Sequence, residues 1–128
     1  MHDLYLSTNV VQHAIVAQAK IIKKIADEGS CVIIGRATNH VLREYDNIVN
    51  VFIYAPKDYR KKKIMEMYGD SEEEAIKSIK RSDEVRGAYY KNITGENWAN
   101  ARNYDLCIDS SLGLEKTAQV ICDYLKNI

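Results

Sequence analysis

The sequence lacks an excess of either charge and lacks any long apolar run. It has 18 Lys and Arg against 18 Asp and Glu, so its formal net charge is zero. No overall field attracts nucleic acid or an anionic membrane, and any nucleotide binding must therefore be local. No apolar run approaches the roughly 20 residues that span a bilayer. Because the first residues also do not resemble a signal peptide, we expect a cytoplasmic protein with no membrane or nucleic-acid partner.

Cysteine and histidine are also scarce, with 3 of each. Cys31, Cys107 and Cys122 lack C-x-x-C spacing and lie in apolar stretches, which predicts reduced, buried core residues. The histidines lack the spacing of metal ligands, and solvated or packed histidines are the commoner case. We therefore expect no protein metal site.

The apolar pattern alternates between short strands and amphipathic helices, and the chain of 128 residues fits one domain. This order predicts an α/β fold with a parallel sheet. Two helices are expected to bury apolar stripes, one through Ile64, Met67 and Tyr68 and one through Leu114, Ala118, Ile121, Cys122 and Leu125. The expected strands are 31–34, 48–54 and 104–109, and the expected helices are 10–26, 38–44, 57–68, one beginning after Ser71, and 114–125.

The expected strand 31–34 is followed directly by Gly35 and Arg36. Ligands of open α/β sheets bind beyond the carboxyl ends of the strands, and a glycine there lets a ligand approach the backbone. Arg36 is therefore a candidate anion-binding residue. The alternative is a surface arginine in an ordinary turn, because one Gly-Arg pair is a weak motif.

The helix after Ser71 begins with a capping box, in which Glu74 stands three residues after the N-cap serine. From position 80 onward this helix is polar on nearly all sides, so it must either be solvated or contact something charged. Asp83 and Arg86 are three residues apart and are expected to pair. The functional interpretation is a mobile segment whose arginines close over phosphates.

Four stretches together resemble the cytidylate kinase-like family of nucleoside monophosphate kinases. They are residues 31–36, residues 51–55 followed by Arg60, residues 83–86 followed by two tyrosines, and residues 104–111. The resemblance covers roughly residues 22–125. It implies a P-loop kinase fold, in which a parallel sheet lies in three α/β/α layers and a helical lid spans about residues 71–100. It also implies transfer of the γ-phosphoryl group of ATP, with Mg²⁺, to CMP, dCMP or a related nucleotide.

The resemblance further implies roles for individual residues at the acceptor site and in the lid. Gly35 and Arg36 would bind the monophosphate of the acceptor, because a planar guanidinium matches a phosphate bidentately. Arg86 and Arg81 would close with the lid and neutralise charge on the transferred group, and Asp83 would orient them.

On the ATP side, the resemblance implies Arg60, Asp109 and Ser110. Ala37 stands where well-characterised cytidylate kinases have an aspartate, so the acceptor base stays open. No glycine begins the P-loop pattern G-x-x-x-x-G-K-[ST], whose backbone amides and lysine hold the phosphates of ATP.

In the family, the strand that leads into the P-loop is the central strand of the sheet. Its absence would leave strand edges without partners. We therefore expect either that the chain is the C-terminal two-thirds of a longer kinase, or that rearrangement or another chain, such as a second copy in a homo-oligomer, completes the sheet. Two functions stay open. One is a nucleoside monophosphate kinase that is inactive at this length, and the other is a non-catalytic module for nucleotide binding or self-association.

Overall fold

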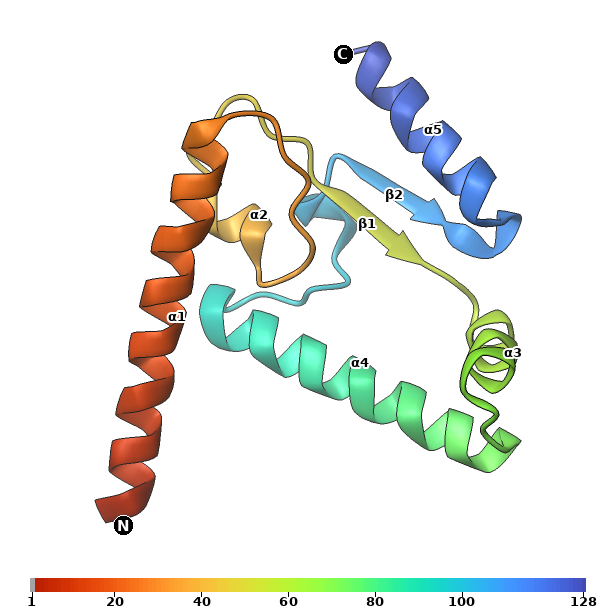
Figure 1. The fold of residues 1–128 in the computed structure, drawn as a ribbon, viewed down its shortest axis with the longest axis horizontal. Helices are drawn as coiled ribbons and strands as arrows, with labels where there is room; N and C mark the ends of the chain where they lie inside the picture. The colour runs from red at the N-terminus through yellow and green to blue at the C-terminus, as the bar shows by residue number, and fades with distance from the viewer. Residues whose placement is uncertain (1) are drawn as a thin grey trace. The chain divides into compact units, whose positions relative to one another are not determined.

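The computed structural model describes residues 2–128, with side chains described from Val10 onward, and divides them into two compact units. The first unit is Met1–Asp46 and the second is Asn47–Ile128. Figure 1 shows the course of the chain. None of the described helices combines the length and the apolar composition that crossing a bilayer requires.

The first unit consists mainly of one helix, α1 (His2–Glu28), followed by an extended segment and the short helix α2 (Thr38–Val41). The expected helix 10–26 is confirmed and is longer at both ends. Ile22 of its apolar stripe is buried, and the hydroxyl of Tyr45 donates a hydrogen bond of 2.8 Å to Asp27 near its end. The short helix expected at 38–44 is confirmed over its first half.

The expected strand 31–34 is wrong. These residues form no strand, and Val32 and Ile34 are 91% and 87% exposed. A strand exists only where a neighbour takes its backbone hydrogen bonds, and no described residue pairs with this segment. Residues 31–34 have the apolar composition of a buried strand, but without a partner strand they are not buried.

The second unit contains a two-stranded parallel sheet made of β1 (Val51–Tyr54) and β2 (Leu106–Asp109). Tyr54 pairs with Asp109, so both strands end at the same edge. The register is extended by Asn50, whose backbone oxygen accepts hydrogen bonds from the amides of Asp105 and Leu106. The α/β class and the parallel pairing are confirmed, and both strands are shorter than expected.

Three helices belong to the same unit, in the order α3 (Lys57–Tyr68), α4 (Glu72–Thr94) and α5 (Leu114–Lys126) along the chain, with single 3-10 turns at Ala101–Asn103 and Ser110–Leu112. The bounds of α3 are those expected, and Gly69 ends it in the left-handed conformation. Ser71 caps α4 as expected, because its hydroxyl accepts a hydrogen bond from the amide of Glu74. Helix α4 is continuous through its polar part (Figure 1).

The core of the second unit is small. Ala75, Ile79 and Tyr90 of α4 and Ile108 of β2 are buried. Spacings of four and eleven residues place the α4 side chains along one stripe of the helix. Helix α3 packs against α4, and this contact accounts for the burial of Ala75 and Ile79 near the beginning of α4.

Several expected core residues are exposed. Met67 and Tyr68 are each 70% exposed, and Leu114 and Leu125 are 82% and 46% exposed. Ala118 and Cys122 are also exposed, and Ile121 is only half-buried. An amphipathic pattern shows which face of a helix suits burial, but a two-stranded sheet offers too little surface to cover these faces.

The prediction that the cysteines are buried is likewise wrong. Cys31, Cys107 and Cys122 are free thiols, and all three are exposed. Cys31 lies in the unpaired extended segment, and Cys107 lies in β2 on the side opposite Ile108, the buried residue next to it.

Candidate phosphate-binding site

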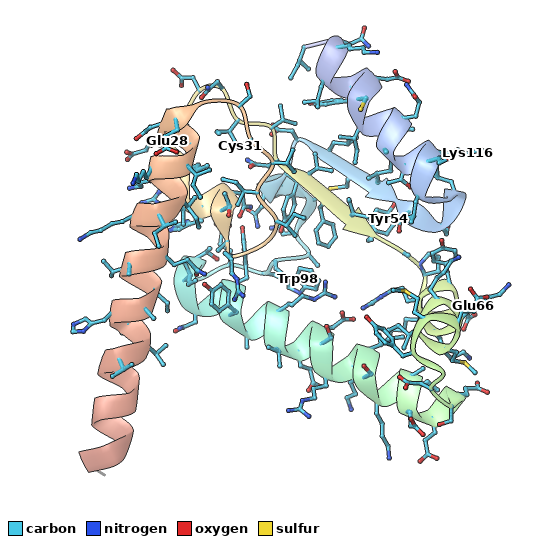
Figure 2. All side chains as sticks on the ribbon, in the orientation of Figure 1. Glu28, Cys31, Tyr54, Glu66, Trp98 and Lys116 are labelled. Atoms are coloured by element: carbon cyan, nitrogen blue, oxygen red, sulfur yellow. The ribbon has the colours of Figure 1, made fainter. Side chains whose placement is uncertain are left out.

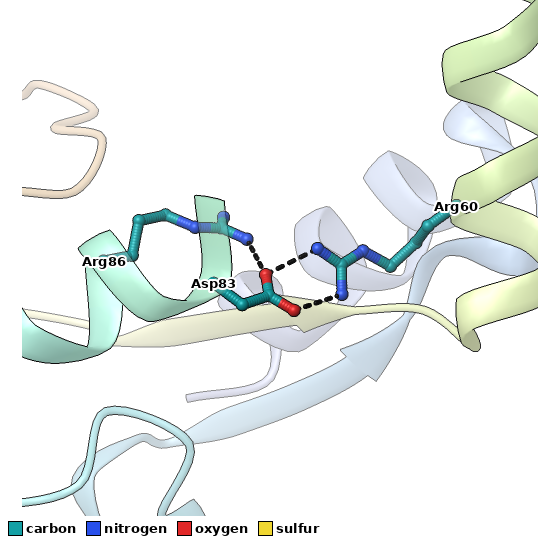
Figure 3. A network of polar contacts seen from close by, with 3 residues as sticks. All are labelled: Arg60, Asp83 and Arg86. Atoms are coloured by element: carbon teal, nitrogen blue, oxygen red, sulfur yellow. Dashed lines mark hydrogen bonds and ion pairs between the residues drawn. The ribbon is translucent and has the colours of Figure 1, made fainter. Parts of the chain in front are cut away.

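Asp83 of α4 holds two arginine side chains at once. Both its carboxylate oxygens accept hydrogen bonds from Arg60 of α3, at 2.6 and 2.8 Å. One of these oxygens also accepts a hydrogen bond of 2.7 Å from Arg86 (Figure 3). Two positive groups therefore share one negative group, and the cluster keeps a net positive charge.

The pairing changes the acid–base behaviour of the cluster. Hydrogen bonds from Arg60, followed by those from Arg86, lower the pKa of Asp83 although partial burial opposes this. The same contact raises the pKa of Arg60. Asp83 is thus ionised and the guanidinium of Arg60 is protonated under ordinary conditions.

Local structure explains why these groups meet. Pro56 comes before the first residue of α3, and α3 begins three residues after β1 ends, so Arg60 lies in the first turn next to the carboxyl end of that strand. Asp83 and Arg86 are one turn apart on α4 and face the same side. A second ion pair of 2.8 Å, between Lys61 and Glu72, also joins α3 to the start of α4.

Arg86 has room for another ligand. Its side chain is 53% exposed, and Asp83 engages only one of its terminal nitrogens. Its guanidinium carbon lies 4.7 Å from the centre of the Trp98 ring, within the range of a cation–π contact. The remaining N–H groups are suited to a second acidic group, such as a phosphate oxygen.

Arg81 does not join this cluster. It is exposed, and no hydrogen bond or ion pair links it to Asp83 in the part of the chain that is described. Two residues along a helix correspond to about 200° of rotation, which directs Arg81 away from Asp83. The structure thus brings together Asp83, Arg86 and Arg60 and leaves Arg81 apart.

Asp109 and Ser110 lie where β2 ends, at the edge it shares with the end of β1. The hydroxyl of Ser110 donates a hydrogen bond of 3.3 Å to the backbone oxygen of Tyr54. Asp109 caps the following turn by accepting a hydrogen bond from the Ser111 amide, and hydrogen bonding from Ser111 lowers its pKa. These two residues secure the edge, and no hydrogen bond links them to Arg60 among the residues described here.

Gly35 and Arg36 lie in the first unit, in a turn of unusual conformation. Gly35, Arg36 and Ala37 have φ values of 72°, 60° and 53°, so three successive residues are left-handed. The amide and hydroxyl of Thr38 both donate to the backbone oxygen of Gly35, at 3.2 and 2.6 Å, and close the turn. The left-handed conformation is costly for Arg36 and Ala37, which are not glycines, and backbone strain of this kind is concentrated at functional sites.

Within the described residues, no group of three His, Cys, Asp or Glu side chains comes together to hold a metal. The carboxylate of Asp83 is fully engaged by arginines and does not fit a metal ligand. The site therefore fits anion binding rather than cation binding.

Sequence reasoning missed two contacts of this site. The ion pair of Arg60 with Asp83 joins residues 23 positions apart, and the ring of Trp98 meets Arg86 from beyond the end of α4. Arg60 stands at the head of a run of four basic residues, which does not single it out, and the one local signal for Trp98 is that the sequence has a single tryptophan.

Comparison with known proteins shows to which family the chain belongs. The family model for the cytidylate kinase-like family matches residues 3–112. The chain belongs to the cytidylate kinase-like family. This confirms the resemblance and indicates a nucleotide kinase-like scaffold; in general, such kinases use ATP and Mg²⁺.

Among solved structures, the crystal structure of an uncharacterized protein from Eubacterium ventriosum is similar, with 30% sequence identity and a TM-score of 0.85. The match covers 92% of this chain and 68% of that one. No curated protein matches the chain.

Proposed function

We propose that this chain is a nucleoside monophosphate kinase-like protein that binds nucleotide phosphates through the cluster of Arg60, Asp83 and Arg86. The observation that carries the proposal is the placement of two guanidinium groups on one carboxylate, in a member of a nucleotide kinase-like family. Phosphoryl transfer requires positioning and electrostatic stabilisation more than covalent chemistry, and oriented arginines supply both.

In this proposal, Arg86 binds a phosphate of the nucleotide, which in a kinase is the transferred one. Asp83 orients the Arg86 side chain, and Arg60 holds Asp83 from the ATP side. Arg36, presented by its strained turn beside Gly35, binds the phosphate of the acceptor nucleotide. The acceptor is CMP, dCMP or a related nucleotide, and the donor is ATP. Asp109 and Ser110 hold the edge of the sheet on the ATP side, and Arg81, which lies outside the cluster, is assigned no contact with the phosphate.

The rest of the family's properties are part of the same proposal. They are the three-layer P-loop kinase architecture of one domain, a lid at about 71–100, and a cytoplasmic location, where ATP and nucleoside monophosphates occur. The described residues offer no carboxylate set for Mg²⁺, so this proposal assigns no protein ligand to that ion.

A second function is favoured by one observation, which is that the sequence contains no G-x-x-x-x-G-K-[ST] segment. Successive backbone amides and a lysine for the phosphates of ATP are then missing from these 128 residues. The alternative is a module that binds nucleotide, or associates with itself, without catalysis.

Calorimetric titration with CMP, dCMP, UMP and AMP tests the binding step. We expect Arg86→Ala to weaken binding of the preferred nucleotide by about tenfold or more, because it removes charge-assisted hydrogen bonds. Arg81→Ala is the matched control on the same helix and should change the affinity by less than about twofold. Absence of binding to all four nucleotides, or equal losses in both variants, would overturn the proposal.

Turnover with ATP and Mg²⁺ separates the two functions. Transfer to one of the four nucleotides that falls in Arg86→Ala supports the kinase. Binding that persists without transfer supports the non-catalytic module.

A further inference from the structure

The only tryptophan of the chain is seated on the backbone of α4, directly beside Arg86. A Cβ atom added at Gly87 would lie 3.1 Å from Nε1 and 3.2 Å from Cδ1 of the Trp98 indole. Such distances are tighter than ordinary contacts of a Cβ atom. The indole therefore uses the space that Gly87, the only glycine within α4, leaves open.

The indole is also fixed from the sheet. Its ring meets that of Phe52 in β1 edge to face, with centres 5.3 Å apart. The Phe52 ring in turn stacks on Tyr104, with centres 4.9 Å apart. The hydroxyl of Tyr104 donates a hydrogen bond of 2.6 Å to the backbone oxygen of Trp98. Ring and backbone of Trp98 are thus both held, and Figure 2 shows where it lies beside α4.

Arg86 lies between this fixed ring and Asp83. Its guanidinium carbon is 4.7 Å from the ring centre of Trp98, and its terminal nitrogen is 2.7 Å from the carboxylate. An exposed arginine has many rotamers, and ordering them opposes ligand binding. Two partners on different sides of the guanidinium remove most of that freedom before a ligand arrives.

We propose that Trp98, seated on Gly87, is a positioning residue that orients Arg86 for the phosphate. This inference rests on the proposed function, because it assigns a purpose to the orientation of Arg86. The competing explanation is that Trp98 only packs the segment after α4 onto β1. That explanation predicts effects on stability but none that depend on Arg86.

The first experiment is a double-mutant cycle measured by calorimetric binding of CMP. Trp98→Leu should weaken binding by about fivefold, while Trp98→Phe, which keeps an aromatic face, should recover most of the loss. In the Arg86→Ala background, Trp98→Leu should have no further effect. Equal effects of Trp98→Leu in both backgrounds would overturn the proposal.

The second variant approaches the same contact from the helix. Gly87→Ala improves helix propensity but places a methyl group against the indole. We expect Gly87→Ala to bind CMP about twofold or more weakly than the wild type, while the midpoint of its thermal unfolding is not lowered. Unchanged affinity, with the emission maximum of Trp98 also unchanged, would count against the proposal.

A third measurement needs no nucleotide, so it distinguishes failure of this inference from failure of the proposed function. The ¹⁵N–¹H heteronuclear NOE of the Arg86 Nε–H reports its order in the ligand-free protein. It should be high in the wild type and in Trp98→Phe, and low in Trp98→Leu. A mobile Nε–H in the wild type would overturn the positioning role, whereas an ordered one without binding of CMP, dCMP, UMP or AMP would leave the positioning intact and overturn the proposed function.

Discussion

Arg60 and Asp83 form a bidentate ion pair, with both carboxylate oxygens bonded to the two terminal nitrogens at 2.6 and 2.8 Å. The pair joins α3 to the middle of α4, and both side chains are about three-quarters buried. Arg86 adds a third group on the same carboxylate. The cluster therefore serves two purposes: it holds two helices together, and it keeps a second guanidinium oriented toward solvent.

Replacing Asp83 tests the first purpose. The folded-state pKa of Asp83 is lowered, chiefly by the hydrogen bonds from Arg60. Its contribution to stability is therefore fully present above the ordinary value of 3.8 and is lost as the pH falls through the lowered folded-state value. We expect Asp83→Asn to reduce the free energy of unfolding by about 1 kcal/mol near neutral pH, and by less in acid.

Urea unfolding at a series of pH values checks this prediction. Glu84→Gln, an exposed neighbour on the same helix, is the control and should leave the stability near neutral pH unchanged. An Asp83→Asn curve parallel to that of the wild type down to about pH 2 would show that the ion pair does not stabilise the fold.

At the opposite end of the pH scale, Tyr104 supplies a second prediction. Desolvation, with smaller contributions from Tyr90 and Cys107, raises its pKa to about 12 from an ordinary value of 10.0. The neutral phenol is favoured in the folded state, so its contribution is fully present below 10.0 and is lost as the pH rises through about 12.

Tyr104→Phe should therefore weaken the dependence of stability on pH in that range. It should also lose the hydrogen bond to the backbone oxygen of Trp98, at a cost of about 1 kcal/mol near neutral pH. Tyr68→Phe is the control, because Tyr68 is 70% exposed. Ultraviolet titration of the wild type should show a phenol that ionises near pH 12, which Tyr104→Phe lacks; a titration curve unchanged by Tyr104→Phe at that pH would contradict the assignment.

The contrast between α3 and the segment 31–34 shows what the sequence can predict. The bounds of α3, its end at Gly69 and the cap at Ser71 follow from contacts within a few residues, which the sequence displays directly. The strand expected at 31–34 depends on a partner elsewhere, and Val32 is 91% exposed because the described chain supplies none. Local rules cannot foresee a missing neighbour.

The candidate site divides in the same way. The pair of Asp83 with Arg86 lies within one helical turn and was predicted from spacing. Arg60 reaches Asp83 across 23 residues, and the ring of Trp98 meets both Phe52 of β1 and Arg86 of α4. These contacts depend on tertiary packing, on which local spacing carries no information.

The cap of α4 gives a third prediction. The hydroxyl of Ser71 accepts a hydrogen bond of 3.2 Å from the Glu74 amide. Ser71→Ala should lower the free energy of unfolding by about 1 kcal/mol, because that amide then lacks its acceptor. Ser78→Ala, at an exposed position inside the same helix, should be neutral or slightly stabilising. Equal urea midpoints for the two variants would contradict a capping role.

The left-handed turn at Gly35, Arg36 and Ala37 supports a final prediction, in which stability and binding separate. Arg36 has a φ of 60°, a conformation that costs an ordinary L-residue about 1 kcal/mol and costs glycine almost nothing. Arg36→Gly and Arg36→Ala both remove the guanidinium, so their difference isolates the backbone. We expect Arg36→Gly to be more stable than Arg36→Ala by about 1 kcal/mol in urea unfolding.

Both variants should nevertheless bind CMP with the same reduced affinity, about tenfold or more below that of the wild type. Each lacks the guanidinium group that is proposed to hold the acceptor phosphate. A glycine variant that binds CMP as tightly as the wild type would show that the turn, and not the guanidinium of Arg36, makes the contact. Equal stabilities of the two variants would show that the left-handed conformation at Arg36 carries no strain. The stability of this turn and its capacity to bind phosphate are thus separable, because one depends on φ and the other on the side chain.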